Sequence, residues 1–136
     1  DEQISLASRF GELLGMAYQV QDDTLDLIGD ERMLGKPVFT DLRGGKKSFV
    51  LVHGMRRCSA EERSFLRGLI NRAGPYSEDE IAEVRRLLEE HGSIDYARER
   101  TSHYVRQAKD VLSSFPESRA TTMLLELSDY LAQRYS

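Results

Sequence analysis

The chain has 136 residues, which fits one domain, or part of one, with a real hydrophobic core. Apolar residues make up 40% and charged residues 31%, and the net charge of −4 gives no reason to expect a nucleic-acid partner. No apolar stretch reaches the roughly 18 residues that cross a bilayer, so we expect no membrane span. The single cysteine, Cys58, has no internal disulfide partner, which favours a reducing, cytoplasmic location.

The apolar pattern predicts an all-α protein with short connections, because no stretch alternates apolar and polar residues as a strand does. We expect a long helix over residues 3–29 and then a loop over residues 30–45, which contains Pro37 and three glycines. Further helices are predicted over residues 46–57, 59–72, 77–91, 93–115 and 117–134.

Local capping signals support several of these boundaries. Ser59 with Glu62, and Ser77 with Glu80, have the spacing of a capping box, in which each side chain binds the other's backbone N–H. Gly92 provides the left-handed residue that commonly ends a helix.

The first predicted helix separates an apolar face from an acidic one. On the acidic face Asp22, Asp23 and Asp26 lie within about one turn of each other. No Lys or Arg occurs from Phe10 to Glu31 to neutralise them. Short carboxylates this close together are ligands that Mg²⁺ shares with phosphate oxygens, so they point to a magnesium–phosphate site; a solvated acidic surface is the alternative. The apolar face comprises Phe10, Leu14, Ala17, Val20, Leu25 and Ile28.

The loop after this helix carries the opposite charge. Lys36, Arg43, Lys46 and Lys47 follow the aspartates closely, and ammonium groups can bind the phosphate oxygens that a metal leaves uncoordinated. The three glycines of the loop permit close approach of the backbone. The alternative is a solvated loop whose lysines point into water.

Residues 18–48, YQVQDDTLDLIGDERMLGKPVFTDLRGGKKS, resemble the second aspartate-rich region of trans-isoprenyl (polyprenyl) diphosphate synthases, such as farnesyl and geranylgeranyl diphosphate synthases. The family pattern is an aromatic residue and Gln, DDxxD, GK, an Asp-Leu pair and a second GK, in this order. Residues 92–118 also resemble the helix and turn that follow in the family. The resemblance implies the C-terminal half of an isoprenoid-synthase-type helical bundle, with residues 1–136 forming the C-terminal portion of one prenyltransferase domain.

This resemblance assigns roles to the acidic residues. Asp22 and Asp26 match ligands of magnesium, and Asp23 belongs to the same cluster, acting partly through water. Asp41 matches an acidic residue that supports the metal site through water or lysine.

Other matching residues are implied to bind substrate. Lys36 and Lys46 match the lysines that hold the allylic diphosphate, and Gln19 matches a glutamine that lines the reaction cavity. Tyr18, beside it, stands where Phe is commonest, and Phe39 stands where a small residue is frequent.

The implied reaction is the Mg²⁺-dependent, head-to-tail condensation of isopentenyl diphosphate with an allylic prenyl diphosphate. Metal ions and lysines stabilise the charge that develops on the leaving diphosphate. The family uses two aspartate motifs on facing helices, and only the later one occurs in this chain. We therefore expect the chain to be inactive alone, with the N-terminal half supplied in cis or as a separate chain, and we expect the homodimer that is usual in the family.

Three other functions remain open. The first is a non-catalytic regulatory subunit of a heteromeric prenyl synthase, against which the retained carboxylates and lysines argue. The second is another class I terpenoid synthase, a group that does not usually carry the GK…DL…GKK loop. The third is a helical interaction module with a fortuitous acidic face, which would bind no diphosphate.

The remaining polar residues suggest no second site. The three histidines, His53, His91 and His103, show no metal-ligand spacing, and Cys58 is expected to be an unreactive thiol. Arg85 is expected on a solvated helix face.

Overall fold

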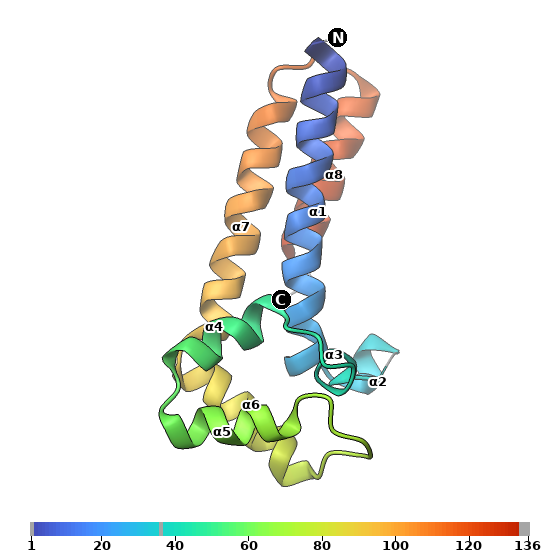
Figure 1. The fold of residues 1–136 in the computed structure, drawn as a ribbon. Helices are drawn as coiled ribbons and strands as arrows, with labels where there is room; N and C mark the ends of the chain where they lie inside the picture. Colours follow the sequence, from blue (N-terminus) through green and yellow to red (C-terminus); the bar gives the residue numbers. More distant parts are fainter. Residues whose placement is uncertain (1, 36, 134–136) are drawn as a thin grey trace. The chain divides into compact units, whose positions relative to one another are not determined.

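The computed structural model describes residues 2–35 and 37–133, apart from the side chain of Met33. The described residues form eight α-helices and no strand, which confirms the all-α prediction (Figure 1). The helices are α1 (Glu2–Ile28), α2 (Glu31–Leu34), α3 (Thr40–Arg43), α4 (Phe49–Arg57), α5 (Ala60–Leu69), α6 (Glu78–Glu90), α7 (Ser93–Leu112) and α8 (Arg119–Gln133). None of these helices combines the length and the apolar character that crossing a membrane requires.

The chain forms two compact units, and α1 and α7 each continue from one unit into the other. The first unit comprises Asp1–Gln21 and Arg98–Ser136, and the second comprises Asp22–Ala97.

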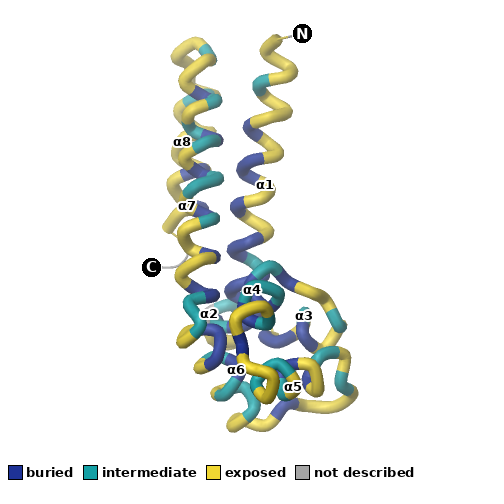
Figure 2. Tube along the Cα trace, turned by 60° about the vertical axis from the view of Figure 1, so that its left-hand side comes forward, coloured by how far each residue is buried: buried dark blue, intermediate teal, exposed yellow. Residues whose placement is uncertain are grey.

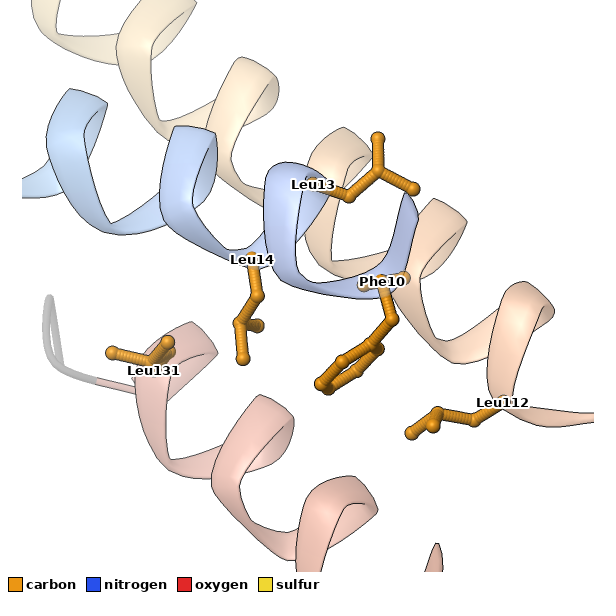
Figure 3. Close-up of a cluster of buried hydrophobic side chains, with 6 residues drawn as sticks. Phe10, Leu13, Leu14, Leu112 and Leu131 are labelled. Atoms are coloured by element: carbon orange, nitrogen blue, oxygen red, sulfur yellow. The ribbon is translucent and has the colours of Figure 1, made fainter. Parts of the chain in front are cut away.

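The core of the first unit lies among α1, α7 and α8. Figure 3 shows Phe10 and Leu14 of α1 directed toward Leu131 of α8, with Leu112 of α7 beside them. Burial of each such side chain contributes roughly 1.5–3 kcal/mol to folding. The fully buried Gln21 adds a polar contact, because its Nε2 donates a 2.8 Å hydrogen bond to the carbonyl of Leu131.

The apolar face predicted for the first helix is the face that α1 buries. Buried residues recur along α1 in Figure 2, and five of the six predicted positions are buried, whereas Ile28 is half-buried. The helical periodicity of the sequence therefore identified the packing face of α1.

Serine side chains cap α4, α5 and α6, and the caps of α5 and α6 confirm the predicted capping boxes. Ser59 and Ser77 form complete capping boxes at the start of α5 and α6. Ser48 accepts a hydrogen bond from the backbone N–H of Leu51 at the start of α4. Gly92, with φ of 66°, directly follows the C-cap of α6.

The structure corrects the predicted loop over residues 30–45. This segment contains the two single-turn helices α2 and α3, and α4 begins at Phe49 rather than at residue 46. Asp30 caps α2 by accepting a 2.7 Å hydrogen bond from the N–H of Arg32, and Gly35 ends it with φ of 65°. A helix of one turn is too short to show a repeating apolar pattern. The glycines and Pro37 were therefore the strongest signals in this segment, and they predicted a loop.

Candidate functional site

The acidic helix and the basic loop meet at Lys46. The Lys46 ammonium lies 2.7 Å from Asp23 Oδ1 on α1 and 2.7 Å from Asp41 Oδ2 on α3. The Asp23 side chain is buried, whereas that of Lys46 is 44% exposed. The pKa of Lys46 is raised above its ordinary value because the hydrogen bonds to Asp23 and then Asp41 stabilise the ammonium more than partial burial destabilises it. Lys46 is therefore a fixed cation at the edge of the acidic cluster.

Asp23 also holds the start of α4. Its second carboxylate oxygen accepts a 3.1 Å hydrogen bond from the backbone N–H of Phe49, the first residue of α4. An N–H at this position has no partner within its own helix, and a negative charge there is favoured by the helix dipole. Asp23 thus joins α1, the basic loop and α4.

Asp26 holds the start of α3 and has little exposed surface. Its Oδ1 accepts hydrogen bonds from the backbone N–H (3.1 Å) and hydroxyl (2.6 Å) of Thr40, and its Oδ2 accepts one from the N–H of Asp41 (3.0 Å). The side chain thereby satisfies the first N–H groups of α3. These contacts place Asp41 where its carboxylate reaches Lys46.

Phe39 adopts a strained backbone conformation between these anchors. Its φ of 59° and ψ of 20° lie in the left-handed region, which costs a non-glycine residue on the order of 1–3 kcal/mol. Two contacts hold it there: the N–H of Phe39 donates a 2.7 Å hydrogen bond to the carbonyl of Asp26, and its ring is buried 6.0 Å from the ring of Tyr76. The large residue at this position belongs to the core beneath the loop.

Asp22 is half-buried and directly precedes Asp23 on α1. Its carboxylate offers the hard oxygen ligand that Mg²⁺ prefers. Asp26 can add a ligand only through a lone pair that its three hydrogen bonds leave available. Asp23 is already paired with Lys46, which suits a contact to the metal through water. Asp22 therefore has the chemistry of a divalent-cation ligand, whereas Asp23 and Asp26 are held by Lys46 and by the start of α3.

The other predicted site residues are placed as follows. Tyr18 and Gln19 are exposed on the part of α1 that belongs to the first unit. Lys36 lies outside the described residues. Lys47 follows Lys46 and is exposed.

Arg85 is a positioning residue that the sequence pattern missed. It was expected in solvent, but its Nε donates to the carbonyl of Leu27 (3.0 Å) and its Nη2 to the carbonyl of Gly29 (2.8 Å). Both carbonyls are at the C-terminal end of α1, where orphan acceptors and the helix dipole favour a cation. Its neighbour Arg86 instead pairs with the exposed carboxylates of Glu83 and Glu90 on α6.

The structure also brings together residues that have no shared spacing in the sequence. One ligand atom from each of Cys58, Glu62 and His91 lies within 4.8 Å of the others. Burial and the nearby Glu62 carboxylate raise the pKa of the Cys58 thiol, and Arg63 opposes them. The sequence offered no signal for this cluster, because His91 is 29 positions from its partner Glu62.

The fold and the carboxylate–lysine cluster define an all-α protein of the isoprenoid-synthase type. Residues 1–88 match the family model for polyprenyl synthetase. The chain therefore belongs to the polyprenyl synthetase family.

Curated relatives and solved structures agree with this assignment. The chain is 34% identical to geranylfarnesyl diphosphate synthase of Aeropyrum pernix, over 88% of this chain and 37% of that enzyme. Its fold is similar to geranylgeranyl pyrophosphate synthetase of Pyrococcus horikoshii (TM-score 0.86, 32% identity, covering 98% of this chain and 40% of the other). It is also similar to a polyprenyl synthase of Caulobacter crescentus crystallised with calcium and isoprenyl diphosphate (TM-score 0.84, 30% identity, 97% and 40% covered). The chain thus spans about two fifths of the length of the relatives it matches.

Proposed function

We propose that the chain supplies the second aspartate-rich motif of a Mg²⁺-dependent prenyltransferase, which condenses isopentenyl diphosphate head to tail with an allylic prenyl diphosphate. The observation that carries this proposal is the Lys46 ammonium, which lies 2.7 Å from the carboxylates of both Asp23 and Asp41. A metal–diphosphate complex needs carboxylates and ammonium groups at one place. The Caulobacter crescentus relative, crystallised with a divalent metal and isoprenyl diphosphate, supports the same ligand class.

In this proposal the aspartates bind the metal and Lys46 binds the diphosphate. Asp22 and Asp26, with Asp23 through water, would hold Mg²⁺, which neutralises the negative charge that develops on the leaving diphosphate. An ammonium group has three N–H donors; Lys46 directs two at Asp23 and Asp41, and the third can be donated to a phosphate oxygen. Asp41 thereby positions Lys46 for the substrate.

The same proposal covers the residues that stand apart from this cluster. Lys36 shares the allylic diphosphate with Lys46, and Tyr18 and Gln19 line the reaction cavity. Both compact units then belong to one helical prenyltransferase domain, to which residues 1–136 contribute the C-terminal portion.

A calorimetric titration tests the diphosphate site. Inorganic pyrophosphate is titrated into the 136-residue chain with Mg²⁺ and again with excess EDTA. We expect binding only with Mg²⁺, and we expect Asp22→Asn to weaken it about tenfold or more, because a charged ligand is lost.

The matched control is Asp110→Asn, which removes an exposed carboxylate from α7 and should leave pyrophosphate binding unchanged. Equal binding with and without EDTA, or full binding by the double variant Asp22→Asn/Asp26→Asn, would contradict the proposed site. Absence of pyrophosphate binding both with and without Mg²⁺ would favour the helical interaction module, which binds no diphosphate.

A further inference from the structure

A second cluster of metal-ligand residues lies at the ends of three helices in the second unit. Cys58 is the C-cap of α4, Glu62 is in the first turn of α5, and His91 is the C-cap of α6. Their ligand atoms lie within 4.8 Å of one another, and none of the three residues belongs to the aspartate–lysine site.

We propose that Cys58, Glu62 and His91 bind one Zn²⁺ ion. A thiolate, an imidazole and a carboxylate are together the ligand set of zinc, a borderline-soft cation that takes sulfur, nitrogen and oxygen. Mg²⁺ and Ca²⁺ instead prefer oxygen ligands alone, so the ion of the aspartate motif does not suit this cluster. A site with three protein ligands leaves the fourth zinc position to water.

The geometry needs only a small contraction to reach tetrahedral coordination. Zinc–ligand bonds of about 2.0–2.3 Å place tetrahedral ligand atoms about 3.3–3.7 Å apart. His91 Nε2 and Glu62 Oε2 are already 3.0 Å apart, and the widest separation in the cluster is at most 4.8 Å. The side chain of His91 is 24% exposed, so its rotation can close the remaining distance while Glu62 stays in the capping box.

Hydrogen bonds already hold the backbone of Cys58 and the carboxylate of Glu62 in place. Arg63 donates hydrogen bonds to the carbonyls of Met55 (2.7 Å) and Cys58 (2.8 Å), so its guanidinium binds the end of α4 rather than competing for the thiolate. The Glu62 carboxylate accepts the Ser59 N–H of the capping box at 2.8 Å. Metal-ligating carboxylates are commonly hydrogen-bonded in this way, which sets their orientation.

Zinc at this position would join the ends of α4, α5 and α6. The start of α4 is held by Asp23 through the Phe49 N–H, so the metal would fix the opposite end of the same helix. The proposed role is structural, because the cluster supplies no residue to the diphosphate site.

Cobalt substitution gives a test specific to this cluster. Co²⁺ replaces Zn²⁺ in tetrahedral sites, and a bound thiolate produces a sulfur-to-cobalt charge-transfer band in the near ultraviolet. Cys58 is the only cysteine of the 136-residue chain, so the band reports on this thiol alone. We expect the band to saturate at one Co²⁺ per chain, with excess Mg²⁺ present to fill the aspartate site, and to disappear when Zn²⁺ is added.

Three variants and two controls define the ligands. Cys58→Ser should abolish the charge-transfer band, and His91→Gln and Glu62→Gln should each weaken Zn²⁺ binding by about tenfold or more. The Gln at 62 keeps an oxygen for the Ser59 cap, and circular dichroism checks that each variant folds. His103→Gln and Asp22→Asn, which lie outside the cluster, should leave the band and the affinity unchanged.

Two results would overturn the proposal. The first is a folded wild-type chain that shows no thiolate band with one equivalent of Co²⁺. The second is a band that persists with unchanged affinity in both His91→Gln and Glu62→Gln, because the thiol would then bind cobalt without its proposed partners.

Discussion

At the residue scale, Lys46 is both a candidate substrate ligand and the counter-ion of a buried carboxylate. Lys46→Met keeps the aliphatic chain but leaves the Asp23 side chain, 6% exposed, without its cation. We expect the free energy of unfolding to fall by about 1–2 kcal/mol, less than for a fully buried pair because Lys46 is 44% exposed. Urea denaturation measures this change.

The pH dependence of this effect follows from the raised pKa of Lys46. A group whose pKa is higher in the folded protein stabilises fully below its ordinary pKa, 10.5 for lysine, and loses that contribution as the pH rises through the folded value. The cost of Lys46→Met should therefore be the same at about pH 7 and about pH 9. The neighbouring Lys47→Met is the control, and an equal loss of stability in that variant would show that Lys46 has no special role.

At the element scale, Arg85 holds the C-terminal end of the helix that carries the aspartates. Arg85→Met leaves the carbonyls of Leu27 and Gly29 without their donors, and burial keeps water from replacing them fully. We expect a destabilisation of about 1–3 kcal/mol. Arg86→Met, one residue along α6, removes only exposed ion pairs and should cost much less. Thermal or urea unfolding of the two variants should rank them in this order.

The start of α6 gives a prediction with the opposite pH dependence. Hydrogen bonds from Arg72 and then from the Ser77 N–H lower the pKa of Glu80 from 4.5 to about 2. Such a group stabilises the fold above its unfolded pKa and loses that contribution as the pH falls toward 2. Glu80→Gln should thus be less stable than wild type near neutral pH, with a difference that shrinks between pH 4.5 and pH 2. A difference that stayed constant over this range would contradict the ion pair's role.

The longer helices could be predicted from sequence because their signals come from residues close together in the chain. The site could be predicted only in part because its contacts join residues that are far apart in the chain. Capping boxes such as Ser59 with Glu62 and the apolar period of α1 involve residues within one or two turns. The Lys46–Asp23 contact joins positions 23 apart; the order of charges predicted a basic loop near the acidic helix but did not pair these two residues. The Arg85–Leu27 contact joins positions 58 apart, and its arginine looks like any exposed helix residue in the sequence.

At the scale of the whole molecule, the chain carries one DDxxD motif, the proposed metal site, whereas the family pattern places two on facing helices. A single motif leaves part of the diphosphate charge without metal, and the basic residues that bind isopentenyl diphosphate in the family belong to the other half. The chain also covers only about two fifths of its relatives' length. We therefore expect the chain alone to form no prenyl product from isopentenyl diphosphate and an allylic diphosphate.

A product assay with labelled isopentenyl diphosphate and Mg²⁺ measures this, with the Aeropyrum pernix geranylfarnesyl diphosphate synthase as the positive control. Adding the N-terminal half of a relative that carries a first aspartate motif should restore turnover if the chain is catalytic, and Asp22→Asn should abolish the restored activity. Restoration that is equally strong with Asp22→Asn would identify the chain as a regulatory subunit. Mg²⁺-dependent product from the chain alone would show that one aspartate motif is enough for ionisation, because no other carboxylate cluster of this kind occurs in the sequence to share the metal.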